Sequence, residues 1–360
     1  MSTPKQQKIQ KRHEDILTIL IRSESAAISE IVASISNLHP KSSKITITRD
    51  LNELIEKGLV KREGRAKATK YKLTVGYKIL APVDLAKYFS KPQDDRTIIE
   101  QFNFKIFGVL RESAVLNNSE IKTLQTLQQK YQTNIQKLSQ TIREREIERV
   151  TIELSWKSSA IEGNTYSLLE TETLLKDGRE ARGKKKEEAI MLLNHKRAFD
   201  FVFKNSGGFE TLDISKIEQV HRLLTQNMNI PRNIRKTLVG ITGTNYKPLD
   251  NQHQITEALE KTCLLLNSMN NTFAKSLISI LLISYIQPFE DGNKRTARII
   301  GNAILLANDA FPLSFRSVGE TEYKEALLVF YEINNVDPFK QLYLQQTEFA
   351  VENYFRTGRD

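Results

Sequence analysis

The stretch QPFEDGNKRTAR, which runs from Gln287 to Arg298, constrains this 360-residue chain more than any other. Pro288 disfavours helix at the residue before it, and Gly292 permits a tight turn. Asn293 is a suitable N-cap for the helix that follows. Apolar residues then recur on one face to about Asn308, so the stretch predicts a loop that opens a helix.

This loop carries the residue types that bind polyphosphate. A helix N-terminus offers free N–H groups and a partial positive charge, both of which favour anions. Arg295 and Arg298 are three residues apart and lie on one side of the first turns. Asp291, just upstream, can hold a Mg²⁺ ion that neutralises the same phosphates. Each residue alone fits an ordinary capped surface helix, but their combination favours phosphate binding.

The motif resembles the signature of the Fic family, H-P-F-x-[D/E]-G-N-[G/K]-R-x-x-R. It matches at every specified position except that of the family's catalytic histidine, where this chain has Gln287. Fic proteins mostly transfer AMP from ATP to a hydroxyl of a target protein. The resemblance implies ATP as substrate, Mg²⁺ at Asp291, and nucleotide binding by the remaining polar residues of the motif, which are Gly292, Asn293, Lys294, Arg295 and Arg298.

Gln287 decides what activity can be expected. A neutral amide has no group that titrates near pH 7, and loss of a general base costs about two to four orders of magnitude in rate. Nucleotide binding need not suffer. Two explanations stand: a natural nucleotide-binding pseudoenzyme, or an introduced replacement that silences an enzyme. Of the five histidines, none lies in the motif, and His253 is the one to check for proximity.

Lys294 opens a further alternative. Doc proteins, a branch of the same fold, carry N-K-R and transfer the γ-phosphate instead of AMP. Gly292 and Arg298 favour AMP transfer, because Doc-like motifs generally have alanine at the first position and lack the second arginine.

A second motif lies upstream of the first. Residues 118–162 contain neither glycine nor proline, which predicts a long helical segment, and Gly163 is placed to end it. Ser158 and Glu162 share a helix face and, with Gly163, fit the Fic inhibitory motif [S/T]-x-x-x-E-[G/N]. In the family this glutamate pairs with the second motif arginine, here Arg298, and blocks the productive pose of the ATP γ-phosphate. The alternative is a plain helix end.

Residues 238–249, LVGITGTNYKPL, predict a short β-hairpin because β-branched residues and glycines flank a turn. The segment resembles the Fic flap, which pairs with the target protein by strand addition. The alternative is an ordinary surface hairpin. The resemblance implies target docking by the residues of its tip, which are Gly240, Ile241, Thr242, Gly243, Thr244, Asn245 and Tyr246. The target is not readable from the sequence, and the chain itself is a candidate.

Residues 8–73 resemble a winged helix-turn-helix, with a third helix over 43–57 and two strand-like pieces around Gly64. Ten Lys and Arg against four Asp and Glu lie between Lys41 and Lys72. We expect DNA as a partner, with the third helix in the major groove and the hairpin on the backbone. The alternative is a winged helix used only for protein contacts. The DNA-binding candidates are Lys44, Thr46, Thr48, Arg49, Arg62, Arg65 and Lys67.

The composition agrees with this organisation. A net charge of +10 suits a polyanion partner, and the single cysteine, Cys263, excludes an internal disulfide and a multi-cysteine zinc site. The N-terminus lacks the apolar core of a signal peptide, and the most apolar run, residues 276–286, is too short to span a bilayer. We expect a cytoplasmic protein without membrane contact, and a homodimer is left open.

The sequence thus predicts a mainly α protein: an all-helical Fic domain with a small β-hairpin flap, preceded by a winged helix-turn-helix. The expected domains are 1–75, a connector over 76–120, and a Fic domain over 121–360 whose inhibitory helix spans about 146–163. The expected function is an autoinhibited Fic-type protein adenylyltransferase that Gln287 leaves inactive or impaired. The alternatives are a DNA-binding transcription regulator with a nucleotide-sensing pseudo-Fic domain, and a Doc-like protein kinase.

Overall fold

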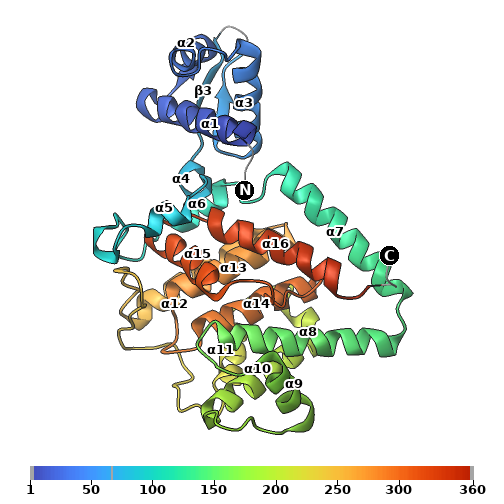
Figure 1. Cartoon of the computed structure of the whole chain (residues 1–360). Coiled ribbons are helices and arrows are strands. Elements are labelled where there is room, and N and C mark those ends of the chain that lie inside the picture. Colours follow the sequence, from blue (N-terminus) through green and yellow to red (C-terminus); the bar gives the residue numbers. More distant parts are fainter. Residues whose placement is uncertain (1–3, 66–67, 357–360) are drawn as a thin grey trace. The chain divides into compact units, whose positions relative to one another are not determined.

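The computed structural model describes residues 4–65 and 68–356, and it is mainly helical (Figure 1). The chain divides into two compact units. The first comprises Met1–Pro82 and Gly108–Ile121, and the second Val83–Phe107 and Lys122–Asp360. The predicted connector, residues 76–120, is therefore shared between the two units, and its portion 83–107 belongs to the second.

The first unit begins with three helices and a small sheet. The sheet is antiparallel with strand order β1-β3-β2, and Arg62 on β2 lies opposite Tyr71 on β3. Ala27 ends β1, where it pairs with Lys70, and the second helix begins at the next residue, Ile28. The elements are α1 Pro4–Ser23, β1 Ala26–Ala27, α2 Ile28–Leu38, α3 Lys44–Glu56, β2 Val60–Glu63 and β3 Lys70–Leu73.

Helix α3 forms where the sequence predicts it, for local reasons. The Ser43 side chain accepts a hydrogen bond from the Thr46 amide at the N-terminus. Gly58 follows the helix with φ +71°, a left-handed conformation that favours glycine. The inward face of α3 buries Leu51 and also Asp50, which forms a buried ion pair with Arg12 of α1. These contacts fix α3 against α1 and leave its opposite face exposed.

The rest of the described chain is helical or irregular. Its elements are α4 Tyr77–Leu80, α5 Leu85–Phe89, η2 Gln93–Asp95, α6 Ile106–Glu112, α7 Asn118–Lys137, α8 Gln140–Ala160, α9 Leu168–Asp177, α10 Lys186–Lys204, η3 Ser206–Phe209, α11 Ile214–Leu224, α12 Gln252–Ser268, α13 Thr272–Ile286, α14 Asn293–Ala307, α15 Glu320–Ile333 and α16 Asp337–Asn353.

Helices α13 and α14 form the centre of the second unit (Figure 1). Helix α13 is buried from Phe273 to Ile286, as its apolar run predicts. It packs against α12, α14 and α15, while α14 also packs against α8, α10 and α11. The two central helices approach closely at Gly301, where an added Cβ would lie 2.7 Å from Ile280 Cγ1. The loop that joins them, residues 287–292, is therefore anchored at both ends in the core.

The predicted continuous helix over 118–162 is interrupted. Helix α7 ends at Lys137, and Ser139 starts α8 by accepting a hydrogen bond from the Ile142 amide at 3.4 Å. A serine at this position stabilises a helix start better than a helix interior, which explains the break. The inhibitory motif thus lies at the end of a separate helix, α8.

The predicted hairpin over 238–249 contains no paired strands. Strands of the described residues occur only in β1, β2 and β3, and residues 238–249 form an irregular loop with a turn at Gly243, whose φ is +89°. Its one isolated bridge is parallel and joins Lys247 to Gln101. The backbone of this loop is thus held by residues 93–101 rather than by its own two arms. We keep the name flap for residues 238–249.

Across the described part of the chain, no helix is both long enough and apolar enough to cross a membrane.

Candidate active site

The loop between α13 and α14 is shaped by two left-handed residues. Gln287 follows α13 with φ +51°, and Gly292 precedes α14 with φ +81°. Gly292 is therefore the N-cap, and Asn293, predicted to be the cap, is the first residue of α14. Glycine suits this position because a Cβ would also lie 3.3 Å from Thr225 Cγ2.

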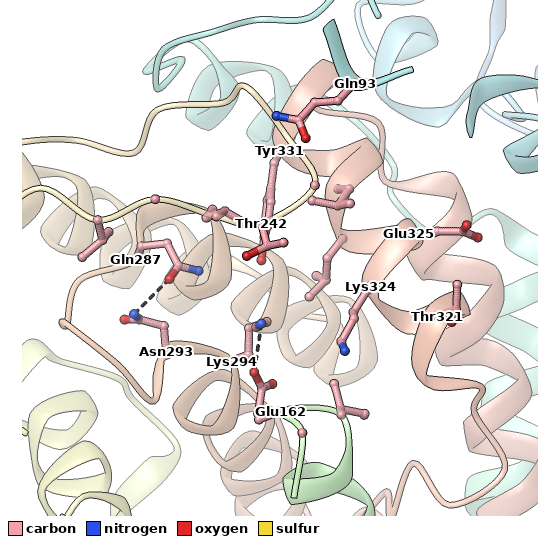
Figure 2. A pocket seen from close by; sticks show the side chains of 18 of the residues that line it. Gln93, Glu162, Thr242, Gln287, Asn293, Lys294, Thr321, Lys324, Glu325 and Tyr331 are labelled. Carbon is pink, nitrogen blue, oxygen red and sulfur yellow. Dashed lines mark hydrogen bonds and ion pairs between the residues drawn. The ribbon is translucent and has the colours of Figure 1, made fainter. Parts of the chain in front are cut away.

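Asn293 closes the loop from within. Its Nδ2 donates to Gln287 Oε1 at 3.0 Å and to the Phe289 carbonyl at 2.7 Å, and its Oδ1 accepts from the Phe289 amide at 2.8 Å (Figure 2). The Gln287 Nε2 in turn donates to the Ser284 carbonyl at 2.6 Å. Both ends of the Gln287 amide are thus hydrogen-bonded, and neither can accept a proton at neutral pH.

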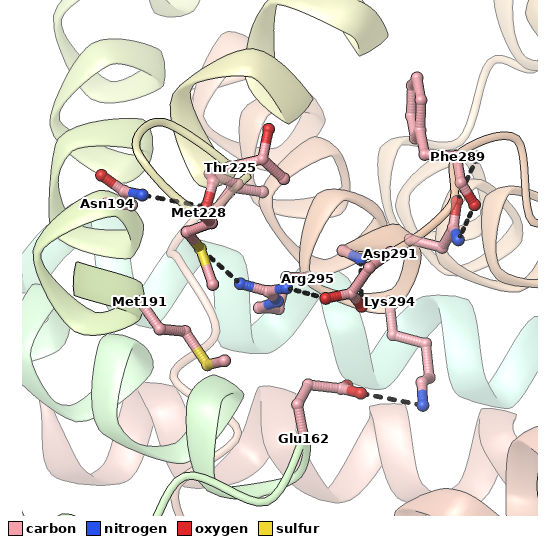
Figure 3. Close-up of polar contacts among 12 residues, drawn as sticks. Glu162, Met191, Asn194, Thr225, Met228, Phe289, Asp291, Lys294 and Arg295 are labelled. Carbon is pink, nitrogen blue, oxygen red and sulfur yellow. Dashed lines mark hydrogen bonds and ion pairs between the residues drawn. The ribbon is translucent and has the colours of Figure 1, made fainter. Parts of the chain in front are cut away.

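Glu162 lies at the centre of a cluster of opposite charges. Its Oε1 accepts from Arg298 Nη2 at 2.9 Å, and its Oε2 lies 2.9 Å from Lys294 Nζ (Figures 2 and 3). Arg298 also donates from Nε to Ser158 Oγ and from Nη2 to the Ser158 carbonyl, both at 2.8 Å. Burial would raise the pKa of Glu162, but Arg298 and Lys294 outweigh it and lower the pKa to about 2. Glu162 is therefore ionised at neutral pH.

Arg295 lies beneath the loop. Its Nη2 donates to Asp291 Oδ2 at 3.1 Å, and its Nη1 faces Met228 Sδ at 3.8 Å (Figure 3). Two buried guanidinium nitrogens of the arginines on α14, Arg295 Nε and Arg298 Nη1, have no hydrogen-bond partner within the described chain. The site therefore holds buried cationic donors whose capacity the protein does not use fully.

His221 supports the loop from α11. Its ring stacks on Phe289 with centroids 3.7 Å apart, and its Nε2 lies 2.9 Å from the Asp291 carbonyl oxygen. Burial lowers the pKa of His221 to about 4, so the ring is neutral at pH 7. His253 is exposed on α12 and does not line the pocket described next.

The loop borders a pocket of about 840 Å³ (Figure 2). One wall is the loop together with Glu162, a second is the flap, and a third is formed by α15 and residues 89–96. Apolar and cationic side chains both line this space, a combination that suits the base and the phosphates of a nucleotide. The lining residues that sequence reasoning missed are Phe89, Lys91, Pro92, Gln93, Arg96, Ile161, Val239, Glu290, Thr321, Lys324, Glu325, Leu327, Leu328 and Tyr331.

The nucleotide-binding candidates divide between two layers. Gly292, Asn293 and Lys294 line the pocket. Arg295 and Arg298 do not, because they are buried below it. Glu162 lines the pocket and contacts Arg298, so its carboxylate lies between the pocket and that guanidinium.

The acidic residues of the pocket suit an ion that arrives with phosphate. Within the described residues, no group of three or more His, Cys, Asp or Glu side chains could hold a metal ion. Asp291 lines the pocket with a side chain that is 63% exposed. Because Mg²⁺ is usually bound by one or two carboxylates together with substrate phosphates, Asp291 fits the role predicted for it.

The flap residues predicted to dock a target face different ways. Gly240, Ile241, Thr242 and Gly243 line the pocket, whereas Thr244 and Tyr246 are buried. Tyr246 donates from its hydroxyl to the Tyr285 carbonyl at 2.9 Å. Asn245 accepts from Gln93 at 2.7 Å and donates to Asp94 at 2.9 Å.

The DNA-binding candidates of the first unit lie on α3 and on the β2–β3 hairpin. Lys44, Arg49, Arg62 and Arg65 are exposed, whereas Thr46 and Thr48 are partly buried. The Thr48 hydroxyl donates to the Lys44 carbonyl at 2.8 Å within α3. Lys67 lies outside the described residues.

Sequence comparison relates part of this chain to known proteins. Residues 211–305 match the model of the Fic/DOC family. The chain is 24% identical to the protein adenylyltransferase fic-1 of Caenorhabditis elegans over 201 residues, which is 54% of this chain and 39% of the relative. It is 30% identical to a probable protein adenylyltransferase of Aquifex aeolicus over 113 residues, 30% of this chain and 34% of the relative. The chain thus spans well under half of these relatives.

Structure comparison agrees. Fic-1 of Caenorhabditis elegans, residues 134–508, aligns with a TM-score of 0.58 and 22% identity, over 66% of this chain and 72% of that one. A Fic-domain-containing signaling protein of Bacteroides thetaiotaomicron aligns with a TM-score of 0.54 and 19% identity, over 67% of this chain and all of that one. At these identities the alignments show a shared fold. Residues 211–305 therefore match the Fic/DOC family, within a chain whose relatives include protein adenylyltransferases.

Proposed function

We propose that the second unit is a Fic-type adenylyltransferase that binds Mg·ATP and transfers AMP to a protein hydroxyl, and that Glu162 holds it in an inhibited state. The observation that supports this most is the position of Glu162. Its carboxylate lines the pocket and is bound to Arg298 and Lys294, the two cations that a terminal phosphate would use.

In the proposed reaction, the target hydroxyl oxygen attacks the α-phosphorus of ATP. A bond forms between that oxygen and phosphorus, the bond to the β-phosphate oxygen breaks, and pyrophosphate leaves with its negative charge. The cationic groups around the loop stabilise this charge, which is how phosphoryl-type transfer is mainly catalysed. Mg²⁺, held by Asp291, would supply further charge neutralisation.

The hydroxyl proton requires an acceptor, and Gln287 cannot provide one. Its amide donates to Ser284 and accepts from Asn293, which leaves it a structural member of the loop. We therefore expect this chain to bind nucleotide far better than it transfers AMP.

Inhibition follows from competition for one guanidinium. Arg298 is fully buried under Glu162, and a carboxylate in charge-assisted contact is a strong competitor of phosphate. A γ-phosphate can reach Arg298 only when the Glu162 side chain has moved.

The test is label transfer from ATP labelled at the α- or the γ-phosphate, with cell lysate as the source of targets. The proteins are this chain, Gln287→His, and Gln287→His combined with Glu162→Ala. The matched control combines Gln287→His with Glu148→Ala, an exposed glutamate of the same helix α8. Strong α-label only with Glu162→Ala supports the proposal. γ-Label would indicate a Doc-like protein kinase, and no label from any protein would contradict enzymatic activity.

We also propose that the first unit binds DNA. The supporting observation is that α3 and the β2–β3 hairpin expose Lys44, Arg49, Arg62 and Arg65 together. Neutralising these residues in pairs should weaken binding to duplex DNA and make it less sensitive to salt. Each cation that no longer neutralises a phosphate lowers the slope of log affinity against log salt concentration by about one. A slope that does not change would contradict this proposal and favour a protein partner.

A further inference from the structure

Arg235 lies just before the flap and is almost completely buried, with 2% of its surface exposed. Its guanidinium donates three hydrogen bonds, all to backbone carbonyl oxygens. Nε donates to Gln287 at 2.6 Å, Nη1 to Thr237 at 2.6 Å, and Nη2 to Leu249 at 2.5 Å. The Arg235 amide also donates to the Pro288 carbonyl at 3.0 Å.

These acceptors belong to three segments of the chain, of which the loop at Gln287 is 52 residues away in sequence. Thr237 precedes the flap, Leu249 ends it, and Gln287 and Pro288 belong to the loop that carries the family motif. One side chain therefore ties both arms of the flap to the loop that would hold the reacting phosphate.

The setting of Arg235 is energetically unusual. A buried cation is costly unless it is paired, and no ion pair found within the described chain includes Arg235. The three charge-assisted hydrogen bonds offset this cost, because they are roughly twice as strong as neutral ones. A side chain that only filled space would not require a charge here, so the charge points to a role in fixing these carbonyls.

A second arginine holds the tip of the same flap. Arg96 donates from Nη2 to the Gly243 carbonyl and lies 3.0 Å from the buried carboxylate of Glu332. Its guanidinium also covers the ring of Phe89 at 5.0 Å. Next to it, the Lys247 amide donates to the Glu100 carbonyl at 2.7 Å.

We propose that Arg235 and Arg96 are positioning residues that fix the flap at its base and at its tip, and so set its distance from the loop at Gln287. Figure 2 shows Thr242 of the flap and Gln287 on the border of the same pocket. The effect of this positioning on AMP transfer rests on the proposed function, whereas its effect on flap order does not.

The first experiment measures hydrogen exchange of the flap amides by mass spectrometry in the full chain. The variants are Arg235→Gln, Arg235→Lys and Arg96→Gln, with Arg316→Gln as the control, an arginine that pairs with Glu153 and does not line the pocket. We expect exchange in peptides covering 238–249 to rise about tenfold or more in both glutamine variants, since each loses charged hydrogen bonds. Arg235→Lys, which keeps the charge but not the three-way geometry, should lie between.

Two outcomes would overturn the proposal. One is unchanged exchange over 238–249. The other is a rise spread evenly over the second unit, which would make the arginines general stabilisers. If Arg235→Gln does not fold, Arg235→Lys and Arg96→Gln decide by the same criteria.

The second experiment places Arg235→Gln and Arg235→Lys in the chain carrying Gln287→His and Glu162→Ala, because Arg235 does not line the pocket. We expect affinity for ATP to stay within about twofold, while the rate of α-label transfer to protein falls about tenfold or more, since misplacement of a bound reactant lowers the rate of the chemical step. Equal losses in ATP affinity and transfer would contradict the positioning role. If the parent shows no transfer, the proposed function fails, and the exchange experiment still decides whether the arginines fix the flap.

Discussion

Among single residues, Glu162 carries most of the charge contacts on which the proposed inhibition depends. Each of its carboxylate oxygens has its own cation, Arg298 on one side and Lys294 on the other. The spacing of Ser158 and Glu162 predicts the first contact through the family motif. The second was missed, because Lys294 was assigned to nucleotide. Under the proposed inhibition, moving the Glu162 carboxylate away from Arg298 would break both ion pairs.

The first prediction concerns Glu162→Gln and pH. The pKa of Glu162 is about 2 in the folded protein against an ordinary 4.5, so its ionised form stabilises the fold above pH 4.5, and this contribution is lost as pH falls toward 2. At pH 7 the substitution should lower the free energy of unfolding by at most about 3 kcal/mol. Urea denaturation at several pH values measures the free energy of unfolding of both proteins. A difference in this free energy that stays constant from pH 7 to pH 3 would contradict the lowered pKa of Glu162.

The second prediction is a coupling between Lys294 and Glu162. Because the Lys294 side chain is 27% exposed, solvent screens the pair, and we expect a coupling of about 0.5–1 kcal/mol. A double-mutant cycle on unfolding free energy with Lys294→Met and Glu162→Gln measures it. The control cycle uses Lys247 and Glu100, an exposed pair at 3.5 Å, where coupling should be near zero. Equal coupling energies in the two cycles would contradict a specific contribution of the Lys294–Glu162 ion pair to stability.

Among the elements, the contact between α13 and α14 positions the loop that carries the motif. The third prediction is that Gly301→Ala destabilises the protein, because its Cβ would lie 2.7 Å from Ile280 Cγ1. Overpacking of this kind costs about 1–3 kcal/mol, which exceeds the gain in helix propensity of up to about 1 kcal/mol. Thermal unfolding measures it. The control is Gly108→Ala in α6, where an added Cβ meets open space and should not destabilise; destabilisation by both substitutions would indicate a backbone effect instead.

The sequence predicts elements well where the signal is local. The apolar run of α13 and the turn at Gly292 are each encoded by a few neighbouring residues. The predicted N-cap of α14 was one residue off. Gly292, in the left-handed conformation, is the N-cap, and the Asn293 side chain instead hydrogen-bonds within the loop. For the flap, β-branched residues favoured strands, but the partners of its backbone are Arg96, Glu100 and Arg235, which no local pattern reveals.

The same limit applies to the site. Arg235 and Arg96 carry no signal in their own neighbourhoods, since their acceptors are backbone carbonyls up to 147 residues away. The residues of α15 that line the pocket were missed for the same reason. Their contribution depends on how helices pack, whereas the motif could be recognised from its spacing alone.

At the scale of the whole molecule, the chain forms two units with separate cores, joined by more than one chain crossing. The fourth prediction is that each unit has its own unfolding transition. Leu51→Ala should lower the free energy of unfolding of the first unit, and Ile280→Ala that of the second. We expect a loss of about 2–5 kcal/mol in each case, because both side chains are fully buried. Differential scanning calorimetry checks this, and a single transition shifted by both substitutions would show that the units unfold together.

The hydrogen bonds that fix the flap leave its side chains free to vary. Both arginines donate hydrogen bonds to main-chain carbonyl oxygens of residues 237–249, and none of these bonds involves a flap side chain. Substitutions at Val239, Ile241 or Thr242 can therefore alter what the flap offers to a partner without releasing it from its supports. Under the proposed function, the position of the flap would be set separately from the side chains it offers to a target, which would leave target preference open to stepwise evolution and to deliberate retargeting.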